Sequence, residues 1–150
     1  MAVTDGLRRV WVERMLSALV VLAVGGAIFA LTIQSPEDTM GLSVGFSRAL
    51  ARLFRFEGVP DQYLMRKIGH TIEFFFMGLA VCWAVEMWSG GAVPHGRRLA
   101  ITLSICAASS LFDQTHKLFV TGREFDVLDL PFDVLGYSLA IGLGALFRRF

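Results

Sequence analysis

The sequence predicts an all-α integral membrane protein, built as a bundle of four transmembrane helices. Hydrophobic residues make up 55% of the 150 residues and charged residues only 18%, and the mean hydropathy is +0.59. A soluble domain of this size cannot bury that much apolar surface, so much of it must face lipid. Helices are expected because a membrane-spanning backbone has to satisfy its own hydrogen bonds. Residues 1–150 contain no internal repeat and are predicted to form one domain.

Four apolar runs come close to the roughly 20 residues that a helix needs to cross a bilayer. They are Met15–Ile33, Ile68–Trp88, Leu99–Phe112 with an extension to about Lys117, and Leu130–Phe147. The first run carries no charge. It is predicted to be a retained helix, because the run is long for a signal peptide and lacks a small-residue cleavage site.

The long first loop contains a further amphipathic segment. Its apolar residues recur at helical spacing and its arginines lie on the opposite face; they are Phe46, Ala49, Leu50, Leu53 and Phe54, against Arg48, Arg52 and Arg55. This pattern predicts either a helix in the membrane interface, with its arginines at headgroup phosphates, or a re-entrant helix packed on the bundle. Asp61 is placed to cap the helix that follows.

Orientation in the membrane is predicted from the basic residues. An even number of spans puts both termini on one side, and each side then carries seven Lys or Arg residues: Arg8, Arg9, Arg14, Arg97, Arg98, Arg148 and Arg149 against Arg48, Arg52, Arg55, Arg66, Lys67, Lys117 and Arg123. The first helix usually dominates the choice. Both termini are therefore expected in the cytoplasm, with the protein in the plasma or inner membrane.

Charge and cysteine content exclude some classes of function. The formal net charge is +1 and no basic run is present, so binding to nucleic acid is not expected. The two cysteines, Cys82 and Cys106, lie in apolar runs and are expected to be packed thiols rather than a disulfide framework.

The main functional signal is a group of ionisable residues at one end of the predicted spans. The residues are Arg66, His70 and Glu73 at the start of the second span, Asp113, His116 and Lys117 at the end of the third, Arg123 in the next loop, and Asp129 and Asp133 at the start of the fourth. In an antiparallel bundle these ends meet at one membrane face, within about two helical turns. The sequence therefore predicts a polar site just below the extracytoplasmic face.

Several of these residues also have a structural interpretation. Glu73 and Asp133 lie a full turn inside the bilayer, where an unpaired charge is costly, so pairing with Arg66, Arg123 or Lys117 is expected. Asp129 precedes Leu130 and Pro131 and is predicted to be a helix cap rather than a catalytic group. Lys67 is predicted to be an interfacial anchor, and the structural interpretation of Lys117 is a snorkelling side chain.

Two blocks of this sequence resemble the VanZ-like membrane proteins. The first, Arg66-Lys67-Ile68-Gly69-His70-Thr71-Ile72-Glu73-Phe74, is similar to the family's Lys-x-x-His-x-x-Glu-Tyr/Phe element. The second runs from Asp113-Gln114-Thr115-His116-Lys117 through Arg123 to Asp129, Asp133 and Gly136, and resembles the family's Asp-Glu-x-His-Gln stretch and its continuation. The resemblance covers about Met15 to Leu146.

The resemblance implies an integral protein of the cell envelope. The family is named for a member associated with resistance to the glycopeptide teicoplanin, and the resemblance does not supply a biochemical activity. Gln114 stands where the family usually has Glu, and Lys117 where it usually has Gln. These two departures put in doubt any chemistry that depends on that Glu.

Two functions of different classes are predicted. In the first, the site binds an envelope lipid, a glycolipid or lipid-linked intermediate, or a lipophilic glycopeptide. Arg66, Arg123 and the arginines of the first loop contact anionic groups, and Glu73, Asp113 and Asp133 orient them. Lys117 and Asp129 are further substrate-binding candidates. In the second, an intramembrane hydrolase or transferase uses His70, Glu73, Asp113 and His116, either as zinc ligands or in metal-free acid–base catalysis. The sequence specifies no cofactor.

A transporter ranks last, because four spans are too few for an inverted-repeat carrier. Gly136, Gly142 and Gly144 on the last span would allow close helix contact in a homo-oligomer.

Overall fold

The computed structural model describes residues 2–34, 41, 44–45, 48 and 61–147. It contains four helices over these residues: α1 (Ala2–Ile33), α3 (Gln62–Ser89), α4 (His95–Lys117) and α5 (Leu130–Leu146). The described residues contain no strand, which confirms the all-α prediction. The amphipathic segment predicted in the first loop lies largely outside the described residues.

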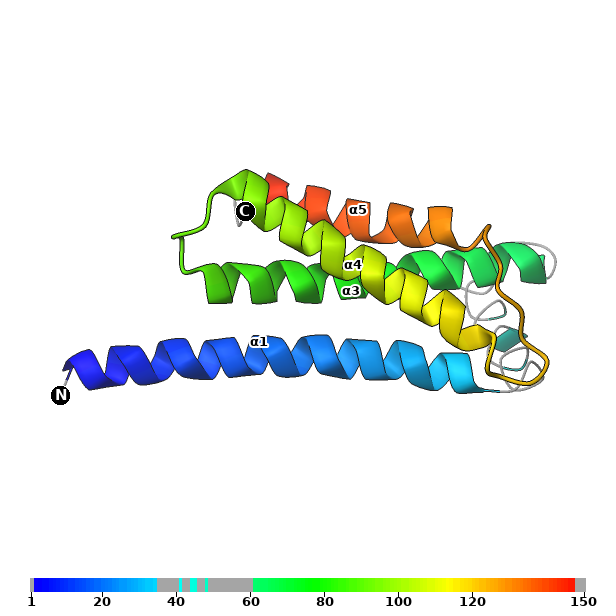
Figure 1. The fold of residues 1–150 in the computed structure, drawn as a ribbon, viewed down its shortest axis with the longest axis horizontal. Coiled ribbons are helices and arrows are strands. Elements are labelled where there is room, and N and C mark those ends of the chain that lie inside the picture. Colours follow the sequence, from blue (N-terminus) through cyan, green and yellow to red (C-terminus); the bar gives the residue numbers. More distant parts are fainter. Residues whose placement is uncertain (1, 35–40, 42–43, 46–47, 49–60, 148–150) are drawn as a thin grey trace.

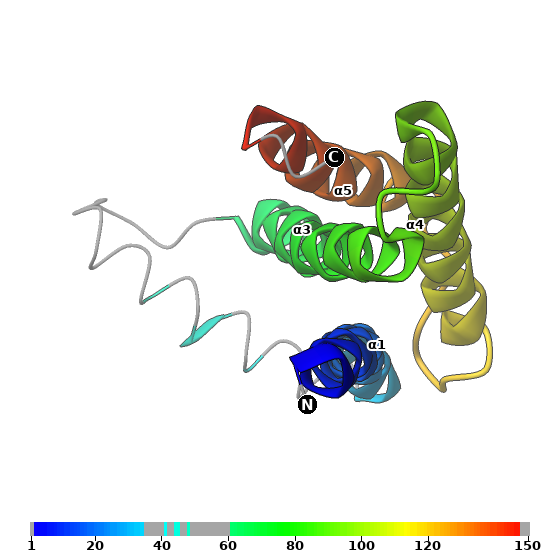
Figure 2. The same cartoon turned by 90° about the vertical axis from the view of Figure 1, so that its left-hand side faces the viewer.

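The helices form a bundle around α3. α3 packs against α1, α4 and α5, and the end-on view shows it between α1 and α5, with α4 along one side (Figure 2). α1, α3 and α5 follow the long axis, whereas α4 crosses it obliquely (Figure 1). α1 begins and α5 ends at the same end of the molecule, as four antiparallel helices require (Figure 1).

Two of the four helices are long and apolar enough to cross a membrane. They are the 28-residue segment Gly6–Ile33 of α1 and the 27-residue segment Tyr63–Ser89 of α3. α5 is a shorter apolar helix of 17 residues. α4 has the length but buries polar side chains such as Thr102, Ser110 and Asp113. Membrane-crossing by α4 and α5 therefore stays a prediction.

The contact between α3 and α5 depends on glycine. A Cβ atom built on Gly136 would overlap the backbone carbonyl oxygen of Thr71, and one built on Gly78 would lie 2.7 Å from the Cβ of Ala140. The two helices therefore approach backbone to backbone. Alongside this contact runs the apolar core, which consists of Ile28, Phe74, Met77, Val81, Val85, Cys106 and Tyr137. Both cysteines are buried free thiols, as expected.

The helix ends are fixed by local contacts. Asp61 accepts a hydrogen bond from the Tyr63 backbone N–H at 3.0 Å, so the predicted cap of α3 is confirmed. α3 ends at Gly90, whose φ of 54° is left-handed. At this same end the Arg14 guanidinium donates to the Met87 carbonyl at 3.1 Å, which ties α1 to α3.

Candidate functional site

The predicted polar site exists, and Asp129 is at its centre. The Asp129 carboxylate is 2% exposed and accepts hydrogen bonds from Lys67, from Lys117 Nζ at 3.1 Å and from Gln114 Nε2 at 3.3 Å. His70 Nε2 lies 3.2 Å away. α3, α4 and the start of α5 thus converge on one carboxylate. We call these residues, with Asp133, the Asp129 cluster: Lys67, His70, Gln114, Lys117, Asp129 and Asp133.

This arrangement corrects three predictions made for single residues. Asp129 occupies the N-cap position of α5, but its side chain makes no capping hydrogen bond and instead binds the cluster. Lys67, predicted to be an interfacial anchor, is fully buried. Lys117 is 4% exposed and is bound inside the cluster rather than snorkelling. Burial of lysine requires paired carboxylates, and the loop before α5 supplies them.

His70 is held on both edges of its ring. Its Nδ1 lies 3.0 Å from Oδ1 of Asp133, which is fully buried. Its Nε2 lies 3.2 Å from Lys117 Nζ. Ser110 on α4 donates to the other Asp133 oxygen at 2.6 Å. Asp133 is therefore paired with His70 and Ser110, not with the Arg66, Arg123 or Lys117 side chains expected for it.

Asp126 joins the site from the loop before α5, and sequence reasoning missed it. It accepts hydrogen bonds from Arg66 and from Lys67 Nζ, the latter at 2.8 Å. The hydrogen bond from Lys67 lowers the pKa of the Asp126 carboxyl below its ordinary value. At Asp129 burial acts to raise the carboxyl pKa, but hydrogen bonds and charges from His70, Lys67 and Lys117 lower it overall. Both carboxylates are therefore stabilised as anions.

Asp113 connects the cluster to α1. Its Oδ1 accepts a hydrogen bond from Thr32 near the end of α1, and its Oδ2 lies 3.2 Å from Lys117 Nζ. The same Thr32 hydroxyl lies 3.1 Å from the Ile28 carbonyl, which is the alternative acceptor for its single proton. The end of α1 is thus bound to α4 by a buried polar contact rather than by apolar packing alone.

Arg123 fastens the loop after α4 to the same helix end. Its Nη2 donates to the Leu31 carbonyl at 3.0 Å and its Nε donates to the Gln34 carbonyl at 3.1 Å. Burial lowers the pKa of the Arg123 guanidinium, while the Asp113 charge raises it. Gly122, with φ of 79°, makes the turn that directs Arg123 back to α1.

Glu73 and His116 do not join the Asp129 cluster. Glu73 is half-buried and makes none of the expected ion pairs with the described residues. His116 packs instead on the Phe29 ring, with 4.5 Å between the ring centroids. The two imidazoles therefore lie in different environments: His70 in the Asp129 cluster and His116 against an aromatic ring.

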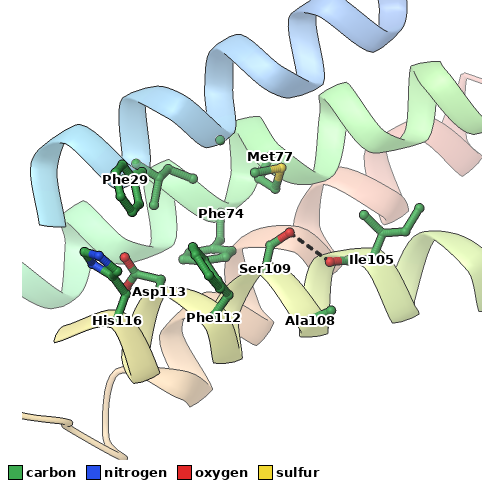
Figure 3. Close-up of a pocket in the computed structure, with 11 residues that line it drawn as sticks. Phe29, Phe74, Met77, Ile105, Ala108, Ser109, Phe112, Asp113 and His116 are labelled. Carbon is green, nitrogen blue, oxygen red and sulfur yellow. Dashed lines mark hydrogen bonds between the residues drawn. The ribbon is translucent and has the colours of Figure 1, made fainter. Parts of the chain in front are cut away.

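His116 and Asp113 form one end of a groove between α1 and α4 (Figure 3). The cavity has a volume of about 540 Å³. Its other walls are mainly apolar: Gly25, Ile28, Phe29, Phe74, Met77, Ile105, Ala108, Ser109 and Phe112. Ser109 turns its hydroxyl to the Ile105 carbonyl at 2.9 Å, so it adds little polarity (Figure 3). The groove is an apolar channel with one polar end.

The proposed zinc ligands do not fit a metal ion in this fold. Over the residues that the structure describes, no three His, Cys, Asp or Glu side chains are grouped to hold one. His70 and Asp113 each have protein hydrogen-bond partners, and His116 faces the groove.

The two departures from the VanZ-like pattern meet at one atom. Gln114 Nε2 and Lys117 Nζ both donate to Oδ2 of Asp129. A Glu at position 114 would place a second carboxylate against Asp129, whereas the amide donates a hydrogen bond to it. Gln114 and Lys117 are therefore compatible in this chain, because both donate a hydrogen bond to the same carboxylate oxygen.

Four residues that hydrogen-bond within the polar site were not predicted to do so: Thr32, Ser110, Gln114 and Asp126. The small polar residues Thr32 and Ser110 lie within apolar runs, and that exception to the pattern is a usable signal. Asp126 gave no such signal, because its loop position is typical of a solvated acid.

Comparison with known proteins identifies the family of this chain. The model of the VanZ/LLP1 family matches residues 16–148. No curated protein and no solved structure matches the chain. The matched region holds all of α3, α4 and α5, together with the Asp129 cluster and the groove. The chain therefore belongs to the VanZ/LLP1 family of membrane proteins.

Proposed function

We propose that this chain binds an amphiphilic lipid of the cell envelope in the groove between α1 and α4. The apolar tail of the lipid lies along Phe29, Phe74, Met77 and Ile105, and its headgroup lies at Asp113 and His116. The observation that carries this proposal is an apolar cavity of about 540 Å³ with a carboxylate and an imidazole at one end. Ligand sites commonly combine apolar walls with few polar groups.

The position of the groove favours a lipid over a soluble ligand. α1 is one of the two membrane-capable helices, and its segment Gly6–Ile33 is only 17% buried within the protein. Phe29 on α1 and Phe112 on α4 are exposed at the groove. A groove between such helices opens toward lipid, so lipid chains reach it directly.

The Asp129 cluster has a positioning role in this proposal. Arg66, Lys117, Asp129 and Asp133 are engaged with other protein groups, and Arg123 holds the end of α1. Together they fix the helix ends that form the polar end of the groove. The ion pairs thereby set its shape, because buried charges tolerate little displacement from their partners.

The proposal includes four membrane crossings with the polar end outside the cytoplasm. α5, at 17 residues, is at the lower limit of spanning length, and α4 buries the charged residues Asp113 and Lys117 against the bundle. Cysteine labelling from each side of the membrane tests this topology: residues near Leu118 should label from outside and residues near Gly91 from inside.

The binding proposal is tested by filling the groove. Ala108 lines it, whereas the neighbouring Ala107 does not and is exposed to the surroundings. In nanodiscs containing a photoreactive phospholipid, Ala108→Trp should remove most crosslinking to Phe29 and Phe112 peptides, and Ala107→Trp should leave it unchanged. Equal crosslinking in both variants would overturn the proposal.

Metal-free acid–base catalysis on a lipid-linked substrate is the second candidate. The observation that favours it is the imidazole of His70, oriented by Asp133 at 3.0 Å. Its other nitrogen faces Asp129 and Lys117, so a substrate proton would have to replace a protein contact. Purified protein incubated with labelled envelope lipids should then release a product, and His70→Gln should stop the release without removing binding.

A further inference from the structure

We propose that the groove selects a phospholipid whose headgroup carries a primary ammonium, as an ethanolamine headgroup does. The ammonium is bound by Asp113 and His116, beside the rings of Phe29 and Phe112. This inference rests on the proposed lipid binding and adds the headgroup chemistry that the site recognises.

Asp113 retains capacity to accept a hydrogen bond. The residue is 4% exposed, and its Oδ1 accepts from Thr32. Its Oδ2 is buried and accepts no hydrogen bond from the described residues, although Lys117 Nζ is 3.2 Å away. Lys117 Nζ donates a hydrogen bond to Asp129 and also lies 3.2 Å from His70 Nε2. A buried oxygen of this kind favours an incoming N–H donor.

The charge at Asp113 also favours a cation. Among the described residues, Lys117 is the one cation within 4.0 Å of the Asp113 carboxylate, and it is shared with Asp129. Asp129 is also paired with Lys67, whereas this shared ammonium is the cation that lies beside the Asp113 carboxylate in the described part of the chain. An anionic headgroup placed at the groove end would meet the Asp113 charge at close range, where the local dielectric is low.

His116 supplies a second acceptor next to Asp113. Its Nδ1 is buried and has no hydrogen-bond partner in the described part of the chain. With the ring proton on Nε2, Nδ1 accepts a hydrogen bond. Figure 3 shows the two side chains at the same end of the groove, beneath Phe29. Two acceptors side by side match an ammonium that has several N–H donors.

Aromatic rings complete the surroundings of the cation. Phe29 and Phe112 line the same cavity, with ring centroids 6.3 Å apart in a stacked arrangement. His116 lies against both rings, at 4.5 Å and 6.0 Å. Ring faces attract cations, including quaternary ones. The carboxylate and imidazole acceptors therefore distinguish a primary ammonium from a trimethylammonium, because a trimethylammonium has no N–H to donate.

The experiment compares three phospholipids with identical acyl chains, which carry ethanolamine, choline and glycerol headgroups. Apparent Kd values are measured by native mass spectrometry on the full chain in non-ionic detergent. The ethanolamine lipid should bind about tenfold more tightly than the other two, the gain expected for one charge-assisted hydrogen bond. Ala108→Trp should weaken all three, and Ala107→Trp should weaken none.

Two substitutions test the headgroup contacts. His116→Phe keeps an aromatic ring outside the Asp129 cluster and should reduce the ethanolamine preference about threefold or more. Asp113→Asn should bring the ethanolamine lipid level with the choline lipid. Because that variant also alters the contact with Lys117, the comparison of the three lipids on the unmodified chain is decisive on its own.

The outcomes separate the two proposals. Equal affinity for the three lipids, still lost in Ala108→Trp, overturns the ammonium inference and leaves lipid binding in the groove intact. A preference for the glycerol or choline headgroup also overturns the inference. Binding that Ala108→Trp does not change overturns the proposed function itself.

Discussion

Nδ1 of His70 lies 3.0 Å from Oδ1 of Asp133, and this contact joins α3 to α5 inside the bundle. Asp133 is fully buried, and His70 is nearly so. A charge in this place is stable only while its partner remains, since desolvation is not offset by solvent. The pair therefore makes the packing of α3 on α5 depend on two side chains 63 residues apart.

Replacing Asp133 tests that dependence. Asp133→Ala removes the partner of His70 and the acceptor of the Ser110 hydrogen bond, so the free energy of unfolding should fall by about 3 kcal/mol. Thermal unfolding in non-ionic detergent, followed by loss of helical signal, measures the change. Ser110→Ala provides the milder comparison and should cost about 1 kcal/mol. Equal stability of Asp133→Ala and the parent would show that the contact contributes nothing.

Lys67 and Arg66 are adjacent in sequence, and both pair with Asp126, yet they should differ greatly in effect. The Lys67 side chain is 0% exposed and that of Arg66 is 47% exposed. Lys67→Met leaves Asp126 and Asp129 short of a buried cation and should cost about 3–5 kcal/mol. Arg66→Met removes a solvent-screened pair and should cost less than about 1 kcal/mol. Chemical unfolding of both variants under the same conditions decides this, and equal losses would contradict the burial argument.

Alanine substitution at two glycines of α5 should have different effects on stability. Gly136→Ala places a methyl group against the Thr71 backbone, which cannot move aside without separating α3 from α5. A loss of about 3 kcal/mol or misfolding is expected. Gly142 has nothing within 4 Å of a built Cβ, so Gly142→Ala should be neutral or up to about 1 kcal/mol stabilising. Melting temperatures of the two variants measure the contrast, and a stable Gly136→Ala protein would refute it.

Acid should weaken the loop contact between Asp126 and Lys67. The pKa of Asp126 is lowered in the folded chain from an ordinary value of 3.8. A carboxyl of this kind stabilises the fold above its unfolded pKa and loses that contribution as the pH falls through the folded value. The contribution of Asp126 to stability should therefore be complete above about pH 5 and decline below about pH 4. Unfolding curves across this range give the slope, and Asp126→Asn should flatten it. A decline of the same steepness in Asp126→Asn would assign the effect to other groups.

Restoring the family's Glu at position 114 should be harmful in this chain. Gln114 donates to Asp129 at 3.3 Å, and Gln114→Glu replaces that donor with a second carboxylate. The expected cost is about 2–3 kcal/mol, because a buried donor is lost and a like charge gained. Gln114→Met, of similar size but uncharged, should cost less. If Gln114→Glu were as stable as the parent, the match between Gln114 and Lys117 would be refuted.

The helices and the end at which the charges gather were predictable from the sequence. Apolar runs bounded by polar residues predicted each helix. The structure confirms Asp61 as the cap at the start of α3. The face shared by Arg66, His70 and Glu73 followed from helical spacing. Helix position alone therefore placed His70 and Asp133 at the same end of the bundle.

The pairing of individual side chains was not predictable in the same way. Helical spacing places Glu73 close to His70. It does not show that Asp126 and Asp129 from the loop would form the ion pairs with Lys67. His116 was grouped with His70 because their positions along the membrane normal agree. α4 crosses the bundle obliquely (Figure 1), and His116 packs on Phe29 of α1 instead. Crossing angles depend on packing that a single sequence pattern does not encode.

Arg123 grips α1 through the main-chain oxygens of Leu31 and Gln34. Every residue type has a carbonyl oxygen, so the side chains at positions 31 and 34 are free to vary over evolution without loss of this fastening. The arginine, in contrast, has no equivalent substitute, since lysine lacks the two-pronged guanidinium. Among related chains, the residues at positions 31 and 34 should therefore vary, whereas Arg123 should not.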